Sequence, residues 1–255
     1  MDKIRLIHLR KYFGNKSVLR DVNLSLKEGE ITAVIGRSGC GKSVMLKHII
    51  GLMKPDSGQV FIDEQEISVM RDRGLYKIRK KIGFLFQSSA LLDSLTVGEN
   101  IGLALSELSS FSPEEIRRVV CEKLDMVGMS GTYNYMPADL SGGMKKRVGL
   151  ARAIALNPEI ILYDEPTTGL DPIMSDSINE LIIFMKNQLN ATSVVVTHDL
   201  TSVRKVADNV AMLHEGEIVF HGNIRELDTT DNPIVRQFVE GRSDGPINPA
   251  LKVCD

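Results

Sequence analysis

The octapeptide GRSGCGKS, residues 36–43, is the feature of this sequence that most constrains its fold. It fits the pattern G-x-x-x-x-G-K-[ST], in which glycines let backbone N–H groups turn inward around phosphate oxygens. The apolar run EITAVI before it is typical of a buried strand, and a helix after it would direct its N-terminal dipole at an anion. A strand, a phosphate loop and a helix in this order predict a nucleotide-binding α/β fold.

Within this loop, Lys42 is expected to reach the β- and γ-phosphates, and the Ser43 hydroxyl is expected to bind Mg²⁺. The rest of the predicted cradle consists of Gly36, Arg37, Ser38, Gly39, Cys40 and Gly41. Cys40 is interpreted as a spacer without a redox role. The three cysteines of the chain are too few and too scattered for a disulfide framework or a zinc site.

Composition excludes several classes of protein. The 255 residues carry a formal net charge of −2, so no global basic field argues for a nucleic-acid partner. No apolar run approaches the roughly 18–20 residues that span a bilayer, and the first residues lack the apolar core of a signal peptide. We therefore expect a globular, cytoplasmic protein.

Short apolar runs alternate with amphipathic helical patterns, which indicates an α/β fold. Strands are predicted at 4–9, 22–26, 30–36, 59–62, 81–86, 159–165 and 193–199, with a hairpin at 209–222. From 97 to 135 the pattern becomes mostly helical, with one helix starting at Ser112-Pro113 and stopping at Gly128. We expect 97–135 to be a helical subdomain inserted into a core of 1–96 and 136–222, followed by a C-terminal helix and tail at 223–255.

Polar side chains follow several of the predicted strands. Asp164 and Glu165 follow EIILY, where the first carboxylate can hold Mg²⁺ through water and the second can polarise an attacking water. Gln87 follows GFLF and His198 follows SVVVT, and each of these two gains meaning only from its order in the chain. A second helix start made of small residues, LSGGM at 140–144, is another potential anion site.

Taken in order, these segments resemble the ATP-binding-cassette (ABC) ATPase family over roughly residues 4–222. LSGG between a phosphate loop and a Walker B strand is nearly unique to that family. The resemblance implies an ABC-type P-loop ATPase core with an N-terminal antiparallel β subdomain and an inserted α-helical subdomain. It also implies that ATP is hydrolysed with Mg²⁺ as cofactor.

The resemblance further implies individual roles for residues of this chain. Glu165 would be the general base, His198 the γ-phosphate switch, and Gln87 the Q-loop residue that senses Mg²⁺ and the transporter. Ser43, Gln87 and Asp164 would surround the metal. Ser141, Gly142 and Gly143 would form the signature that binds nucleotide, with Asp171 in the D-loop. Phe13 would stack on adenine, with Tyr12 as the alternative.

In ABC ATPases two copies pair head to tail, so that each signature completes the other copy's nucleotide site. The family pattern therefore implies a homodimer that sandwiches two ATP molecules. The sequence departs from the commonest family pattern at Met144, where glutamine is usual, but the Ser-Gly-Gly part is intact.

Several stretches look like the ATPase of Mla-type (MCE-associated) phospholipid transport systems, which act between inner and outer membranes. The most telling are LFQSSAL, the methionine of LSGGM and the tail RQFVEG…DGP. That resemblance implies an integral-membrane permease, an MCE-domain lipid-binding protein and, in many relatives, a STAS-domain protein as partners. It implies a location on the cytoplasmic face of the inner membrane. The tail beyond Gly241 reaches the neighbouring ATPase in relatives, and a disordered terminus is the alternative.

Other functions share part of this pattern. An ATPase of an importer for a small solute, such as an amino acid, has every catalytic motif and stays open as the alternative. Chromosome and repair ABC ATPases need a long coiled coil between P-loop and signature, and no sustained heptads occur there. Ribosomal forms carry two cassettes, and a GTPase would need Asn-Lys-x-Asp, which is absent. A purely structural binding module would not need Lys42, Glu165 and His198.

Overall fold

The strands form two sheets in the computed structural model, which describes residues 1–247. The smaller sheet is antiparallel and has four strands in the order β2-β1-β4-β5. Its strands are β1 (Asp2–Phe13), β2 (Lys16–Lys27), β4 (Ser57–Ile62) and β5 (Gln65–Glu66). This sheet is the antiparallel β subdomain that the sequence predicts near the N-terminus.

The larger sheet has six strands in the order β10-β9-β3-β8-β7-β6. Its strands are β3 (Ile31–Ile35), β6 (Ile82–Leu85), β7 (Ile160–Asp164), β8 (Thr192–Val196), β9 (Asn209–His214) and β10 (Glu217–Gly222). All neighbouring pairs are parallel except β9 and β10, which form the predicted hairpin. Every residue of β3, β7 and β8 is buried, which explains the unbroken apolar runs in the sequence.

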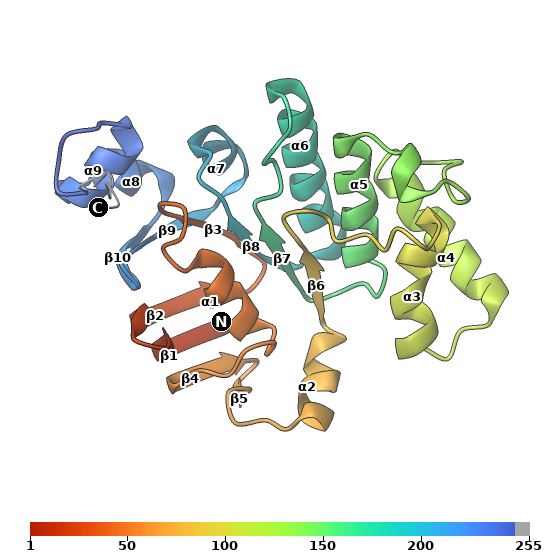
Figure 1. Ribbon diagram of the computed structural model, residues 1–255, viewed down its shortest axis with the longest axis horizontal. Coiled ribbons are helices and arrows are strands. Elements are labelled where there is room, and N and C mark those ends of the chain that lie inside the picture. Colours follow the sequence, from red (N-terminus) through yellow and green to blue (C-terminus); the bar gives the residue numbers. More distant parts are fainter. Residues whose placement is uncertain (248–255) are drawn as a thin grey trace.

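Helices lie on both sides of the larger sheet (Figure 1). They are α1 (Lys42–Ile49), α2 (Asp72–Arg79), α3 (Val97–Leu108), α4 (Pro113–Met126), α5 (Gly142–Ala153), α6 (Pro172–Leu189), α7 (Leu200–Val206), α8 (Ile224–Thr229) and α9 (Pro233–Glu240). Helix α1 lies between the two sheets, where Met45, Leu46 and Ile49 are fully buried in a core shared with the small sheet. Helices α3 and α4 pack against α5 at one end of the molecule, and α8 and α9 lie at the opposite end.

The predicted helix start at Ser112-Pro113 is confirmed. Ser112 Oγ accepts the N–H of Glu115, and the Glu115 carboxylate accepts the N–H of Ser112, which forms a capping box. Gly128 follows the helix with a φ of +67°, a left-handed conformation that suits glycine at a helix end. The fold class is therefore as predicted, while the exact limits of the subdomain at 97–135 stay a prediction.

Two features differ from the sequence-based expectations. Helices α2 and α8 were not anticipated, because α2 has only Leu75 and Ile78 as buried positions and α8 has only six residues. Strand β1 continues to Phe13 because its register shifts around His8, which has a φ of +49°. The predicted C-terminal helix is α9, and its Gln237 side chain binds the backbone of Ile247. The rest of the predicted tail, 248–255, lies outside the described residues.

Within residues 1–247, no helix combines the length and apolar character that crossing a membrane requires.

Close packing between β6 and α5 predicts a cost for any side chain at Gly83. A Cβ there would lie 2.2 Å from the carbonyl oxygen of Ala153, a backbone atom that cannot move aside easily. We expect Gly83→Ala to lower the free energy of unfolding by about 1–3 kcal/mol in chemical denaturation. Gly74→Ala is the control, because the nearest atom is the flexible Met70 side chain at 3.3 Å. The control should keep stability or raise it by up to about 1 kcal/mol, and equal stabilities of the two variants would contradict the prediction.

Candidate nucleotide-binding site

The phosphate loop connects β3 to α1 and depends on glycine at two positions. Gly36 has a φ of +145°, and a Cβ there would lie 2.2 Å from the carbonyl oxygen of Leu213. Gly41 has a φ of +111° and is the N-cap of α1. The first N–H groups of α1 have no partner within the helix, so they are available to an anion at this end.

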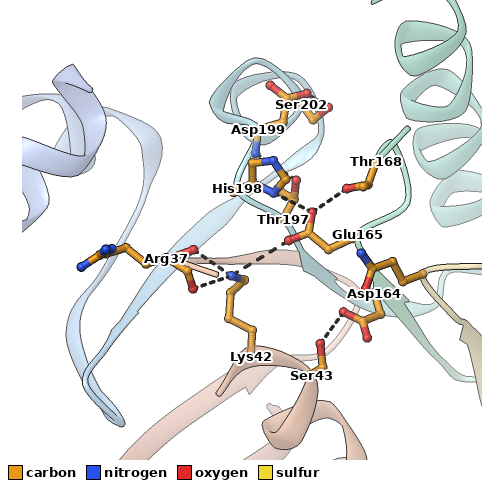
Figure 2. Close-up of polar contacts among 12 residues, drawn as sticks. Arg37, Lys42, Ser43, Asp164, Glu165, Thr168, Thr197, His198, Asp199 and Ser202 are labelled. Atoms are coloured by element: carbon orange, nitrogen blue, oxygen red, sulfur yellow. Dashed lines mark hydrogen bonds and ion pairs between the residues drawn. The ribbon is translucent and has the colours of Figure 1, made fainter. Parts of the chain in front are cut away.

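Lys42 and Ser43 lie at the start of α1 and face the carboxylates at the end of β7 (Figure 2). Lys42 Nζ donates hydrogen bonds to the carbonyl oxygens of Gly36 at 2.7 Å and Arg37 at 3.1 Å. It also lies 4.0 Å from Glu165 Oε1. Ser43 Oγ donates to Asp164 Oδ1 at 2.9 Å. The phosphate loop and the carboxylates at the end of β7 therefore form one polar cluster, although Ser43 and Asp164 are 121 residues apart in the sequence.

Glu165 occupies a constrained backbone position at the centre of this cluster. Its φ is +49°, which is uncommon for a residue other than glycine, and its N–H donates to the carbonyl of Val196 in β8 at 2.9 Å. Its Oε2 accepts a hydrogen bond from Thr168 Oγ1 and lies 2.9 Å from His198 Nδ1. Figure 2 shows this carboxylate between Lys42 and His198. Such a carboxylate can accept a proton from a water molecule beside the phosphate loop.

A cavity of about 360 Å³ lies beside this cluster, which contributes Lys42, Ser43 and Glu165 to its lining. It is lined by Val18, Ser38, Gly39, Gly41, Lys42, Ser43, Val44, Gln87 and Glu165. The loop residues, Gln87, Glu165 and His198 follow β3, β6, β7 and β8, four consecutive neighbours in the sheet. Parallel strands present their carboxyl ends at one edge, which is where α/β folds bind ligands.

The residues at this edge fit a magnesium ion. Ser43 Oγ and Asp164 Oδ1 are adjacent, and Gln87 lines the same cavity. Mg²⁺ prefers oxygen ligands and is commonly bound through one or two carboxylates together with substrate phosphates. Residues 1–247 contain no cluster of three or more His, Cys, Asp or Glu side chains that could hold a metal without such help.

The surroundings of Asp164 disfavour the ionised form of its carboxyl. Burial raises the pKa of its carboxyl, and the nearby charge of Glu165 raises it further, whereas the hydrogen bond from Ser43 lowers it. A cation bound beside this carboxylate would relieve the penalty, because an opposite charge favours the ionised form.

The signature residues and Asp171 lie apart from this cavity. Ser141 is the N-cap of α5, and its Oγ accepts the N–H of Met144 at 3.3 Å. Asp171 caps α6 in the same way by accepting the N–H groups of Ile173 and Met174. A Cβ on Gly143 would lie 2.3 Å from Met174 Cε, so the two helix starts adjoin. None of these residues lines the phosphate cavity of its own chain.

The structure says less about the predicted roles of Phe13, Tyr12 and Cys40. Phe13 and Tyr12 end β1, are 47% and 44% exposed, and do not line the cavity, so the choice of an adenine-stacking ring stays a prediction. Burial raises the pKa of the Cys40 thiol, in keeping with its interpretation as an unreactive spacer.

Two residues with polar contacts to the site were missed from the sequence. Thr168 is one, and its position three residues after Glu165 in a tight turn is a signal that could have found it. Lys146 is the other, a buried lysine whose Nζ donates to the carbonyls of Gln87 and Glu165. In the sequence, Lys146 is marked only by its position on the helix that begins at the LSGG motif.

Comparison with known proteins decides the family. A family model described as "ABC transporter" matches residues 19–168. The chain belongs to the ABC transporter family. It is an ATP-binding and ATP-hydrolysing cassette.

Individual ABC proteins align over most of the chain. It is 43% identical to the probable ribonucleotide transport ATP-binding protein mkl of Mycobacterium leprae, over 94% of this chain and 69% of that protein. It is 40% identical to the intermembrane phospholipid transport system ATP-binding protein MlaF of Haemophilus influenzae, over 92% of this chain and 89% of that protein. A solved dimeric ATP-binding cassette in a post-hydrolysis state with ADP and phosphate has a TM-score of 0.80 and 38% identity, over 87% of this chain and 99% of that one.

The electrostatic position of Asp164 predicts a trade-off between stability and binding. Folding raises the pKa of the Asp164 carboxyl. The contribution of this group to the free energy of unfolding is therefore most favourable at low pH and is lost as the pH rises through the folded pKa. Asp164→Asn should therefore raise the melting temperature of the nucleotide-free chain at pH 7, and the gain should shrink toward pH 4. A gain of 1 kcal/mol would be about 2–4 °C.

The same variant should bind ATP more weakly when Mg²⁺ is present and show little change in EDTA. Asp93→Asn, on an exposed loop, is the control for stability and should leave the melting temperature unchanged. A lower melting temperature for Asp164→Asn at pH 7 would contradict the analysis.

Proposed function

We propose that this cassette energises phospholipid transport between an inner and an outer membrane, and that it hydrolyses MgATP as a head-to-tail homodimer. The observation that carries the lipid assignment is the alignment with MlaF, which extends over 92% of this chain and 89% of that protein. The stretches LFQSSAL and RQFVEG and the methionine of LSGGM add to it.

The proposed mechanism assigns a task to each group around the cavity. Lys42 and the N–H groups of the loop hold the β- and γ-phosphates. Ser43, Asp164 and Gln87 would hold Mg²⁺, which would neutralise phosphate charge when bound. Glu165 orients the attacking water and accepts its proton. His198 holds Glu165 and the γ-phosphate in a fixed relation, supported by its 2.9 Å contact with that carboxylate.

The second copy supplies what one chain lacks. Ser141 and the following glycines present a helix start that lies outside their own phosphate cavity, so we propose that they bind the γ-phosphate held by the partner. The likeness to a solved dimeric cassette with ADP and phosphate supports this arrangement. Asp171 caps the adjoining helix at the same surface.

The proposed membrane partner is a permease that contacts the helical part of the cassette. A groove of about 290 Å³ between α3 and α4 supports this, lined by Leu95, Gly98, Glu99, Gly102, Leu103, Ser106, Ile116 and Tyr133. The full proposal includes an MCE-domain lipid-binding protein and a STAS-domain protein as further partners. It locates the cassette on the cytoplasmic face of the inner membrane.

An importer for a small solute is the second candidate. The description of the M. leprae relative as a probable ribonucleotide transport protein favours it. The two candidates share the ATPase chemistry and differ only in the partners and the cargo.

Composite nucleotide sites predict complementation between two inactive chains. Heterodimers of Lys42→Ala with Ser141→Arg, isolated by two different tags, would keep one intact site built from the wild-type halves. We expect up to about half of wild-type turnover, while each homodimer is inactive. Heterodimers of wild type with the doubly substituted chain are the matched control and should be inactive, since both of their sites contain one damaged half. The opposite pattern would show that each site lies within one chain.

The lipid assignment predicts what accompanies the cassette from its native membrane. We expect a tagged chain extracted in mild detergent to bring down a polytopic permease, an MCE-domain protein and phospholipid, all identified by mass spectrometry. Recovery of a permease with a soluble solute-binding protein and no specific lipid would favour the small-solute importer. That result would overturn the lipid assignment and leave the ATPase assignment intact.

A further inference from the structure

Lys146 is a buried cation with two backbone partners from distant parts of the chain. Its side chain is 5% exposed, and it lies in the second turn of α5. Its Nζ donates to the carbonyl of Gln87 and, at 3.1 Å, to the carbonyl of Glu165. These two residues follow β6 and β7, so one ammonium group joins the ends of two neighbouring strands.

The contact with Glu165 fixes a strained backbone. The residue has a φ of +49°, and such conformations persist only when the surroundings determine them strongly. Its N–H donates to the carbonyl of Val196, and its own carbonyl accepts from Lys146 at 3.1 Å and from the N–H of Thr168 at 3.3 Å. The direction of the Glu165 side chain therefore depends on these contacts, of which the one from Lys146 is the only one of the three made by a side chain.

The same face of α5 supports the chain that follows Gln87. Gly149 lies three residues after Lys146, and a Cβ there would lie 2.7 Å from Leu85 Cδ1 and 3.2 Å from Ser89 Cβ. Arg152, three residues further, donates to the carbonyls of Ser89 and Ala90. Both of those residues have positive φ values, 61° and 46°. Helix α5 thus holds the loop after β6 along two turns of helix.

Keeping a cation at this position is costly. Burial lowers the pKa of Lys146, which reflects the penalty for its charge, while the carboxylates of Asp164 and Glu165 oppose that shift. Filling this space would need only an aliphatic side chain, whereas joining two carbonyls needs a donor with more than one N–H.

We propose that Lys146 is a positioning residue for ATP hydrolysis, which holds the backbones of Gln87 and Glu165 in register and ties them to the helix that begins at the LSGG signature. The inference rests on the proposed roles of Glu165 and of the signature. It means that a phosphate bound by Ser141 of one chain acts on a helix whose Lys146 holds the backbones of Gln87 and Glu165 in that same chain. Nucleotide at one site of the dimer would thereby bear on hydrolysis at the other.

The test replaces Lys146 with methionine, which keeps the length of the side chain and removes the donor. Lys123→Met is the matched control. Lys123 lies on α4 rather than α5, is 3% exposed, and donates to Asn157 Oδ1 at 2.7 Å. Lys146→Arg restores a donor with several N–H groups, and Lys146→Leu, which also has no donor, is the second loss variant if the methionine variant does not fold. Each full-length variant is measured for kcat, for the Kd of MgATP and for melting temperature.

We expect Lys146→Met to lower kcat by about 10–100-fold, as small displacements of catalytic groups do, with Kd changed less than about threefold. Lys146→Arg should recover most of kcat. Lys123→Met should lower the melting temperature and leave kcat unchanged. An equal loss of kcat in the two methionine variants, or a Kd that rises as much as kcat falls, would overturn the proposal.

Glu165→Gln separates this inference from the proposed function. If Glu165→Gln is inactive while Lys146→Met turns over normally, only the role of Lys146 is wrong. If Glu165→Gln turns over like wild type, the assignment of the base fails and the role of Lys146 fails with it.

Discussion

Parallel pairing of β3, β8, β7 and β6 is the constraint on which the rest of the molecule depends. Each of these strands ends at the same edge, and each is followed within a few residues by residues that the chemistry needs. A shift of one residue in any pairing would turn alternate side chains to the opposite face of the sheet. The register of the buried apolar strands therefore sets the spacing between Lys42, Glu165 and Gln87.

Short polar contacts pair the charged groups at this edge. Asp164 is held by Ser43, and Glu165 is held by Thr168 and faces Lys42 and His198. Buried ionised groups are tolerated when they are paired and hydrogen-bonded. The same contacts orient each side chain. The residues that lower the free-energy cost of burying these charges therefore also fix how the polar groups are arranged around a bound phosphate.

Much of this could be predicted from the sequence because it depends on local patterns. The phosphate loop, the strand before Asp164 and the cap at Ser112 are each contained in a few consecutive residues, and the structure has the predicted elements at all three. Lys146 could not be found in this way, since its partners lie 59 and 19 residues away and nothing local marks a lysine as buried. Helix α2 was missed because its two buried residues give too short a period to recognise.

The connection between β6 and β7 has a consequence for how such a cassette can diversify. These strands are neighbours in the sheet, yet the chain between them contains the whole of α3, α4 and α5. Because pairing fixes both ends of this excursion, its outer helices can change length and surface without altering the strand ends. The fold thus separates the outer helices α3 and α4 from the edge of the sheet where the polar residues of the site gather. Helix α5 is the one element that belongs to both.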